Sequence, residues 1–100
     1  MNKKYSKLLS ELIALRELLI ADGDSNWVRG VDLVIQTLSS GNPDSLQKAF
    51  EIYTRMNSGK ESFADYFCWD SDRKVMDSRN NALKNIKSNI RQQFSVCAKV

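Results

Sequence analysis

Apolar side chains recur at steps of three and four residues along most of this chain, and short glycine-containing stretches interrupt the pattern. The interruptions fall at Gly23, Gly41 and Asn57–Gly59. Steps of three and four are the signature of α-helices with one buried face, and glycine readily adopts the left-handed conformation that ends a helix. Because the connections are short, successive helices must pack antiparallel. The pattern therefore predicts an all-α fold.

The predicted fold is a single domain, residues 1–100, built as an antiparallel four-helix bundle with a short fifth helical turn. Its helices are expected at about residues 2–22, 25–39, 43–56, 62–68 and 71–96. The third has a clear start signal, with Asn42 as N-cap and Pro43 in the first helical position. The last has only a narrow apolar stripe, typical of a helix on the outside of a bundle. Arg79 interrupts that stripe and is expected to snorkel or to pair with a nearby acid.

Four large aromatic side chains fall within the stretch Phe63–Trp69. Such a cluster either closes a hydrophobic core or contacts a partner. In a helical turn Phe63, Tyr66 and Phe67 share one face, so we expect Phe63 and Phe67 to seal the bundle. Trp69 then points elsewhere. For Tyr66 and Trp69 the pattern fits a core role and an interface role about equally well.

Acidic residues crowd around this aromatic stretch. Carboxylates beside exposed rings suit a surface that grips a basic partner, since rings anchor the contact and charges steer association. Helix capping is the competing explanation for Asp70 and Asp72, with Asp70 or Ser71 as the expected cap of the last helix. The predicted partner-binding residues are Glu61, Asp65, Tyr66, Trp69, Asp70, Asp72 and Asp77.

Basic residues gather at the other end of the chain. Residues 72–100 hold seven Lys/Arg and two Asp/Glu, a net charge of +5, within a chain whose total is +3. Lys84, Lys87 and Arg91 repeat at helical spacing and form a basic ridge. Contact with nucleic-acid phosphates is one interpretation, and a solvated helix face is the other. The second is favoured, because three charges are few and no aromatic on this ridge could stack on bases.

The residue inventory also excludes several kinds of site. Without histidine there is no Ser-His-Asp or Cys-His pair and no His-ligated metal, and two cysteines do not make a standard zinc site. We therefore expect no enzyme, no metal and no cofactor. The densest apolar stretch is broken by Arg16 and Glu17, which excludes a membrane span, and no signal peptide is expected. The expected location is the cytoplasm, with Cys68 and Cys97 reduced.

The order of several short motifs resembles a family of small all-helical bacterial immunity-like proteins. The matching residues are Gly23 and Trp27 at the start of the second helix, Leu38–Asn42 before the third, and Met56–Ser58 followed by Ser62–Asp65. The resemblance implies an immunity protein that binds a cognate bacterial toxin and blocks it by direct contact. A nucleic-acid-associated helical protein that uses the basic ridge is the alternative. Whether the chain is a monomer or a homodimer stays open.

Overall fold

Four α-helices and the 3-10 turn η2 form the computed structural model, which describes residues 5–98. The helices are α1 (Ser6–Ala21), α2 (Trp27–Leu38), α3 (Ser45–Met56) and α4 (Arg73–Ala98), and η2 covers Phe63–Asp65. Within the described residues no strand forms, which confirms the predicted all-α helical bundle. The predicted residues 2–4 of the first helix lie outside the described part of the chain.

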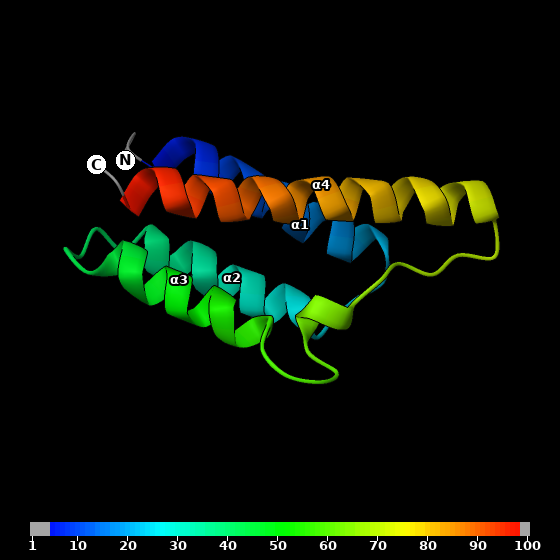
Figure 1. Ribbon diagram of the computed structural model, residues 1–100, viewed down its shortest axis with the longest axis horizontal. Coiled ribbons are helices and arrows are strands. Elements are labelled where there is room, and N and C mark those ends of the chain that lie inside the picture. The colour runs from blue at the N-terminus through cyan, green and yellow to red at the C-terminus, as the bar shows by residue number, and fades with distance from the viewer. Residues whose placement is uncertain (1–4, 99–100) are drawn as a thin grey trace.

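The helices do not pack evenly around one axis. α2 packs closely against both α1 and α3, whereas α4 lies mainly on α1 and contacts α3 much less. Figure 1 shows α4 running along the whole molecule, with its first turns extending past the ends of the other helices. The chain reaches this overhanging end through an irregular segment that follows η2 (Figure 1). The segment is therefore held at one end of the bundle rather than between its helices.

The core consists of the apolar stripes that the sequence predicts. Along α1, the side chains of Leu8, Leu12, Leu15 and Leu19 are completely buried, and each such leucine contributes about 1.5–3 kcal/mol relative to exposure. From α2 and α4 the buried side chains are Val31, Val34, Leu38, Leu83, Ile90, Phe94 and Cys97. The buried stripe of α4 is narrow, as expected for a helix that packs on one side only.

The turn between α1 and α2 follows its sequence signals. Gly23 has a φ of +83°, the left-handed conformation expected after a helix. The amide of Asp24 donates to the carbonyl of Leu19 across this turn, at 2.9 Å. The carboxylate of Asp24 in turn accepts from the amide of Val28 at 2.9 Å, in the first turn of α2. One short turn thus satisfies backbone groups of both helices.

The predicted cap of the third helix is wrong. α3 begins at Ser45 rather than at Pro43, and no side chain caps it. Residues Asn42 to Ser45 instead form a turn, in which the amide of Ser45 donates to the carbonyl of Asn42 at 3.0 Å. Proline at the second position of a tight turn has the same fixed φ as proline at a helix start. The same residues therefore fit both structures, and here the turn is formed.

Candidate protein-binding site

The connecting segment, Tyr66–Asp72, joins η2 to α4; it starts in an extended conformation, with a φ of −67° and a ψ of 136° at Tyr66, and ends in a bend at Ser71 and Asp72. In extended backbone successive side chains point to opposite sides. Cys68 is completely buried, whereas its neighbours Phe67 and Trp69 are 64% and 70% exposed. The segment therefore turns the side chains of Tyr66, Cys68 and Asp70 toward the protein and presents two aromatic rings to solvent.

Phe67 is the main correction to the sequence prediction. The predicted helix at 62–68 is limited to Phe63–Asp65, where the hydroxyl of Ser62 accepts from the amide of Ala64. Phe63 seals the bundle as expected, with no exposed surface and its ring 5.6 Å from that of Trp27. Phe67 does not share this face, because the repeat of two residues in the extended segment replaces the helical repeat.

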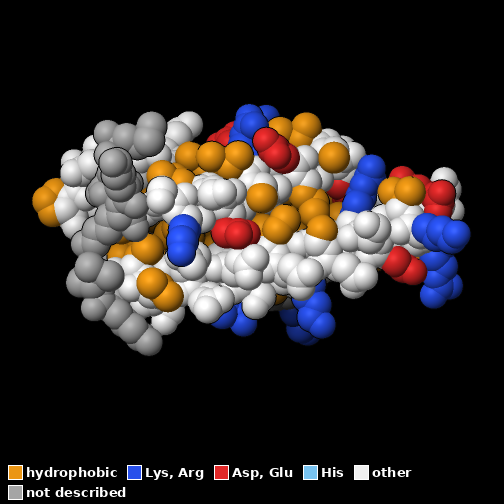
Figure 2. Space-filling model, turned by 90° about the horizontal axis from the view of Figure 1, so that it is seen from above, with side chains coloured by type: hydrophobic (Ala, Val, Ile, Leu, Met, Phe, Trp, Pro, Cys, Tyr) orange, Lys and Arg blue, Asp and Glu red, His pale blue; other side chains and the backbone are white. Residues whose placement is uncertain are grey.

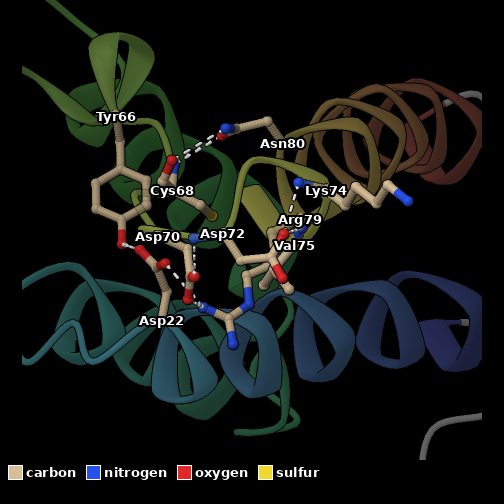
Figure 3. A network of polar contacts seen from close by, with 9 residues as sticks. All are labelled: Asp22, Tyr66, Cys68, Asp70, Asp72, Lys74, Val75, Arg79 and Asn80. Atoms are coloured by element: carbon tan, nitrogen blue, oxygen red, sulfur yellow. Dashed lines mark hydrogen bonds and ion pairs between the residues drawn. The ribbon is translucent and has the colours of Figure 1, made fainter. Parts of the chain in front are cut away.

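Asn80 of α4 fixes the middle of the connecting segment. Its side-chain oxygen accepts from the amide of Cys68 at 2.7 Å, and its side-chain nitrogen donates to the carbonyl of Cys68 at 3.0 Å (Figure 3). One amide side chain thus pairs with both backbone groups of a residue, as a neighbouring strand would. These bonds hold Cys68 between the two exposed rings.

A cluster of charged and polar side chains holds the two flanks of the segment. The hydroxyl of Tyr66 donates to the carboxylate of Asp22, at the end of α1, over 2.5 Å. Arg79 lies between two acids, with its guanidinium 3.5 Å from Asp22 and 3.5 Å from Asp70 (Figure 3). The expected pairing of Arg79 with an acid is confirmed. The segment is therefore tied to α1 and α4 at three of its residues, Tyr66, Cys68 and Asp70.

Asp22 is the residue of this cluster that the sequence prediction missed. Its side chain is only 6% exposed, and it accepts the Tyr66 hydroxyl bond from 44 positions along the chain. A negative charge at the C-terminal end of a helix opposes the helix dipole. An aspartate in that position is a signal that a compensating group lies nearby, and here Tyr66 donates a hydrogen bond to it while Arg79 forms an ion pair with it.

Burial governs the titration of the inward side chains. Loss of solvent, reinforced by the nearby carboxylate of Asp22, raises the pKa of the Cys68 thiol to about 11. The same two causes raise the pKa of Tyr66 well above its ordinary value. Both groups are therefore neutral at pH 7. Cys68 acts as a packed thiol, since a reactive cysteine requires the thiolate.

Two of the predicted acidic residues organise the start of α4. The carboxylate of Asp72 accepts from the amides of Lys74 and Val75, at 2.9 and 3.4 Å, so that Asp72 rather than Asp70 or Ser71 caps the helix. Asp70 accepts from the amide of Asp72 at 2.8 Å and also faces Arg79. Asp70 thus belongs largely to the internal contacts, whereas Asp72 is exposed.

The other predicted acids lie on the surface. Asp65 accepts from the amide of Glu61 at 3.0 Å, which closes the turn where Glu61 has a φ of +58°. Asp77 faces Arg73 at 3.7 Å, one helical turn away. The side chains of Glu61, Asp65, Asp77 and Arg73 are all exposed. Surface ion pairs such as Asp77 with Arg73 contribute little to stability. Figure 2 shows charged side chains of both signs gathered at the end of the molecule where α4 begins.

The basic ridge is divided by the structure. Lys84 and Arg91 are exposed, but Lys87 is partly buried. The ammonium of Lys87 donates to the carbonyl of Phe63 at 3.1 Å and lies 4.5 Å from the centre of the Phe63 ring. Burial, and then the positive charge of Arg91, lower the pKa of Lys87. Lys87 therefore helps to fix η2, and the other two cations face solvent.

The fold and this site define a small helical bundle that presents two aromatic rings on a tied segment at one end. No protein-family model matches the chain, and neither a curated protein nor a solved structure matches it. Among residues 5–98 no helix is both long and apolar enough to cross a membrane. The same residues contain no group of His, Cys, Asp or Glu side chains placed to hold a metal ion.

Proposed function

We propose that this chain is an immunity protein, which binds a cognate bacterial toxin in the cytoplasm and neutralises it by direct contact. The observation that carries the proposal is the exposure of Phe67 and Trp69 on a segment that is held by the side chain of Tyr66, the backbone of Cys68 and the side chain of Asp70. Two large rings held in solvent contribute nothing to the core. Two large exposed rings so close along the chain favour a role in protein contact.

The contacts beneath the rings favour tight binding. Ordering a flexible loop on association costs free energy for each side chain that is immobilised. Here the backbone of Cys68, between the two rings, is already held by Asn80. The segment is thus preorganised, so less of the favourable binding energy of the rings is offset by the cost of ordering the loop. Tryptophan is also among the residue types that most often dominate binding energy.

The surrounding acids indicate the chemistry of the partner. Asp65, Asp72 and Asp77 are exposed close along the chain to the two rings. Their charge favours a partner surface rich in lysine and arginine, chiefly by accelerating association. Such a surface is typical of proteins that act on nucleic acids. The resemblance to immunity-like proteins supports a toxin as the partner, without indicating its charge.

The contact extends beyond the connecting segment. A stable interface takes about 800 Å² from each partner, more than a few residues can supply. The first turns of α4 project beyond the other helices next to the segment (Figure 1). We infer that the toxin covers both the rings and these turns, including Asp77. Neutralisation by occlusion requires only affinity and fit.

The test starts from the neighbouring genes: a toxin-like domain found there is co-expressed with this chain, and the complex is purified. Trp69→Ala is expected to weaken binding by about 30-fold or more, the loss of a hot-spot residue. Leu33→Ala is the matched control, since Leu33 is a half-exposed apolar residue of α2. Failure of the parent protein to bind the domain or to protect cells from it would overturn the proposed function.

A second variant tests the partner's charge. Asp77→Lys removes only a weak surface pair with Arg73, so the fold is expected to stay intact. For a basic partner, association slows by about tenfold at low salt and the difference narrows as salt is raised. An unchanged association rate would show that the acids play no part in binding.

A further inference from the structure

A groove of about 530 Å³ lies between the connecting segment and the middle of α4. The lining residues that define its chemistry are Tyr66, Phe67, Leu83, Lys84, Lys87 and Arg91. Three of these are cations, and no carboxylate lines the groove. Its volume falls in the range of sites for small ligands. The groove is thus cationic along α4 and aromatic along the connecting segment.

Two of the three cations are available to a ligand. Neither Lys84 nor Arg91 forms an ion pair with another residue in the range 5–98. They lie seven positions apart on α4, about 10.5 Å along the helix axis. Burial, and after it the positive charge of Arg91, lower the pKa of Lys87, because both disfavour a further positive charge at this position. An anion bound in the groove would offset the positive charge of Lys84, Lys87 and Arg91.

Phe67 supplies the part that the basic ridge lacks. No residue of α4 beside the ridge is a stacking aromatic, but the extended segment brings the exposed ring of Phe67 to the same groove. The buried side chain of Leu83 lies between the two sides as an apolar floor. A flat apolar surface next to unpaired cations suits a ligand with a planar ring and a phosphate.

We propose that this groove binds a nucleotide unit, with its phosphate at Lys84 and Arg91 and its base against Phe67. The unit is either a free nucleotide or part of a single strand. The proposal concerns a different ligand from the proposed toxin, but it shares Phe67 with the toxin contact, so the two partners would compete for that ring. It takes Phe67 as a groove residue and leaves Trp69, which does not line the groove, outside the site.

The experiment is fluorescence anisotropy of the full chain with a labelled twelve-nucleotide oligo(dT), at 20 to 200 mM salt. Binding is expected at low salt and is expected to weaken steeply as salt increases. Phe67→Ala should weaken binding about tenfold, while Trp69→Ala, also an exposed ring, should leave it within twofold. Lys84→Gln should lower the salt slope by about one, while Lys74→Gln, an exposed lysine of the same helix, should not.

Competition arms identify the ligand. Displacement of the labelled strand by AMP supports a free nucleotide, and displacement by unlabelled strand alone supports a single strand. Two results would overturn the proposal. One is the absence of binding at 20 mM salt, and the other is equal loss in Phe67→Ala and Trp69→Ala. A twelve-residue glutamate peptide that binds as tightly, with the same dependence on Phe67 and Lys84, would also overturn it and assign the groove to an acidic protein segment.

Discussion

The side-chain amide of Asn80 pairs with both the amide and the carbonyl of Cys68, at 2.7 and 3.0 Å. The two residues are 12 positions apart and connect the extended segment to the second turn of α4. Since Cys68 lies between Phe67 and Trp69, these two bonds set the direction of both exposed rings. Binding of the proposed toxin depends on the contact between Asn80 and Cys68, because a loose segment would present the rings in many orientations.

Removal of the Asn80 side chain tests that dependence. Asn80→Ala leaves the amide and carbonyl of the buried Cys68 without their partner and is expected to cost about 1–3 kcal/mol of stability. Asn81→Ala is the control, since Asn81 is exposed on the same helix. Hydrogen exchange at the amide of Cys68 should accelerate in Asn80→Ala alone. Unchanged exchange would show that other contacts fix the segment.

The contact between Asp22 and Tyr66 is expected to be strongly coupled. The two side chains are hydrogen-bonded at 2.5 Å, and the carboxylate is almost completely buried. In a double-mutant cycle of Asp22→Asn and Tyr66→Phe, urea unfolding should give an interaction energy of about 0.5–3 kcal/mol. A cycle of Asp44→Asn and Lys48→Gln, an exposed pair at the start of α3, should give a much smaller value. Equal values would show that the buried contact contributes no more than a surface pair.

The cap of α4 gives a prediction for a single residue. Asp72 accepts from two free amides of the first turn, so Asp72→Ala is expected to lower stability by about 1 kcal/mol. Ser71→Ala, at the neighbouring exposed position, is expected to be nearly neutral. Comparing the thermal unfolding temperatures of Asp72→Ala and Ser71→Ala shows which of the two residues caps α4. A larger loss at Ser71 would place the cap where the sequence first suggested.

Stability is expected to fall at alkaline pH. Burial raises the pKa of Cys68 from 9.0 to about 11 and that of Tyr53 from 10.0 to about 12. Each group has its ordinary pKa in the unfolded chain and the raised pKa in the folded chain. At a pH between these two pKa values the unfolded chain has lost a proton that the folded chain keeps, so the free energy of unfolding decreases as pH rises. Lys87 has a lowered pKa in the folded chain, so its contribution to the free energy of unfolding increases as pH rises.

Variants separate these contributions. Urea unfolding from pH 8 to pH 12 should show the decline in the parent protein. Tyr53→Phe should flatten the part between pH 10 and 12, and Cys68→Ala the part between pH 9 and 11. A stability that is constant across this range would contradict the burial of both groups.

Much of the fold was predictable because its signals are local. The helical stripes and the left-handed glycines at positions 23 and 41 depend on neighbouring residues only. Phe67 was predicted wrongly because the aromatic stretch fits both a helical and an extended repeat. Its alternation of Tyr66, Phe67, Cys68 and Trp69 is a signal for the extended form, but the contact that selects it comes from Asn80, far along the chain.

The site shows the same division between local and distant information. The pairing of Arg79 with an acid follows from its position in the apolar stripe of the last helix. For Trp69 the sequence left a core and an interface role open, and its exposure follows from the extended segment instead. Asp22 was missed because its partners are 44 and more positions away, and no local pattern brings them together. The groove beside Phe67 could not be predicted from the sequence either, since its aromatic and basic sides come from different segments.

Titration calorimetry of the purified toxin domain with the parent protein, Trp69→Ala and Leu33→Ala tests the central claim most directly. Circular dichroism first establishes that the three proteins are equally folded. We expect tight binding by the parent and by Leu33→Ala, and a dissociation constant raised about 30-fold or more by Trp69→Ala. Equal affinity of Trp69→Ala and the parent would show that the exposed rings are not the binding surface.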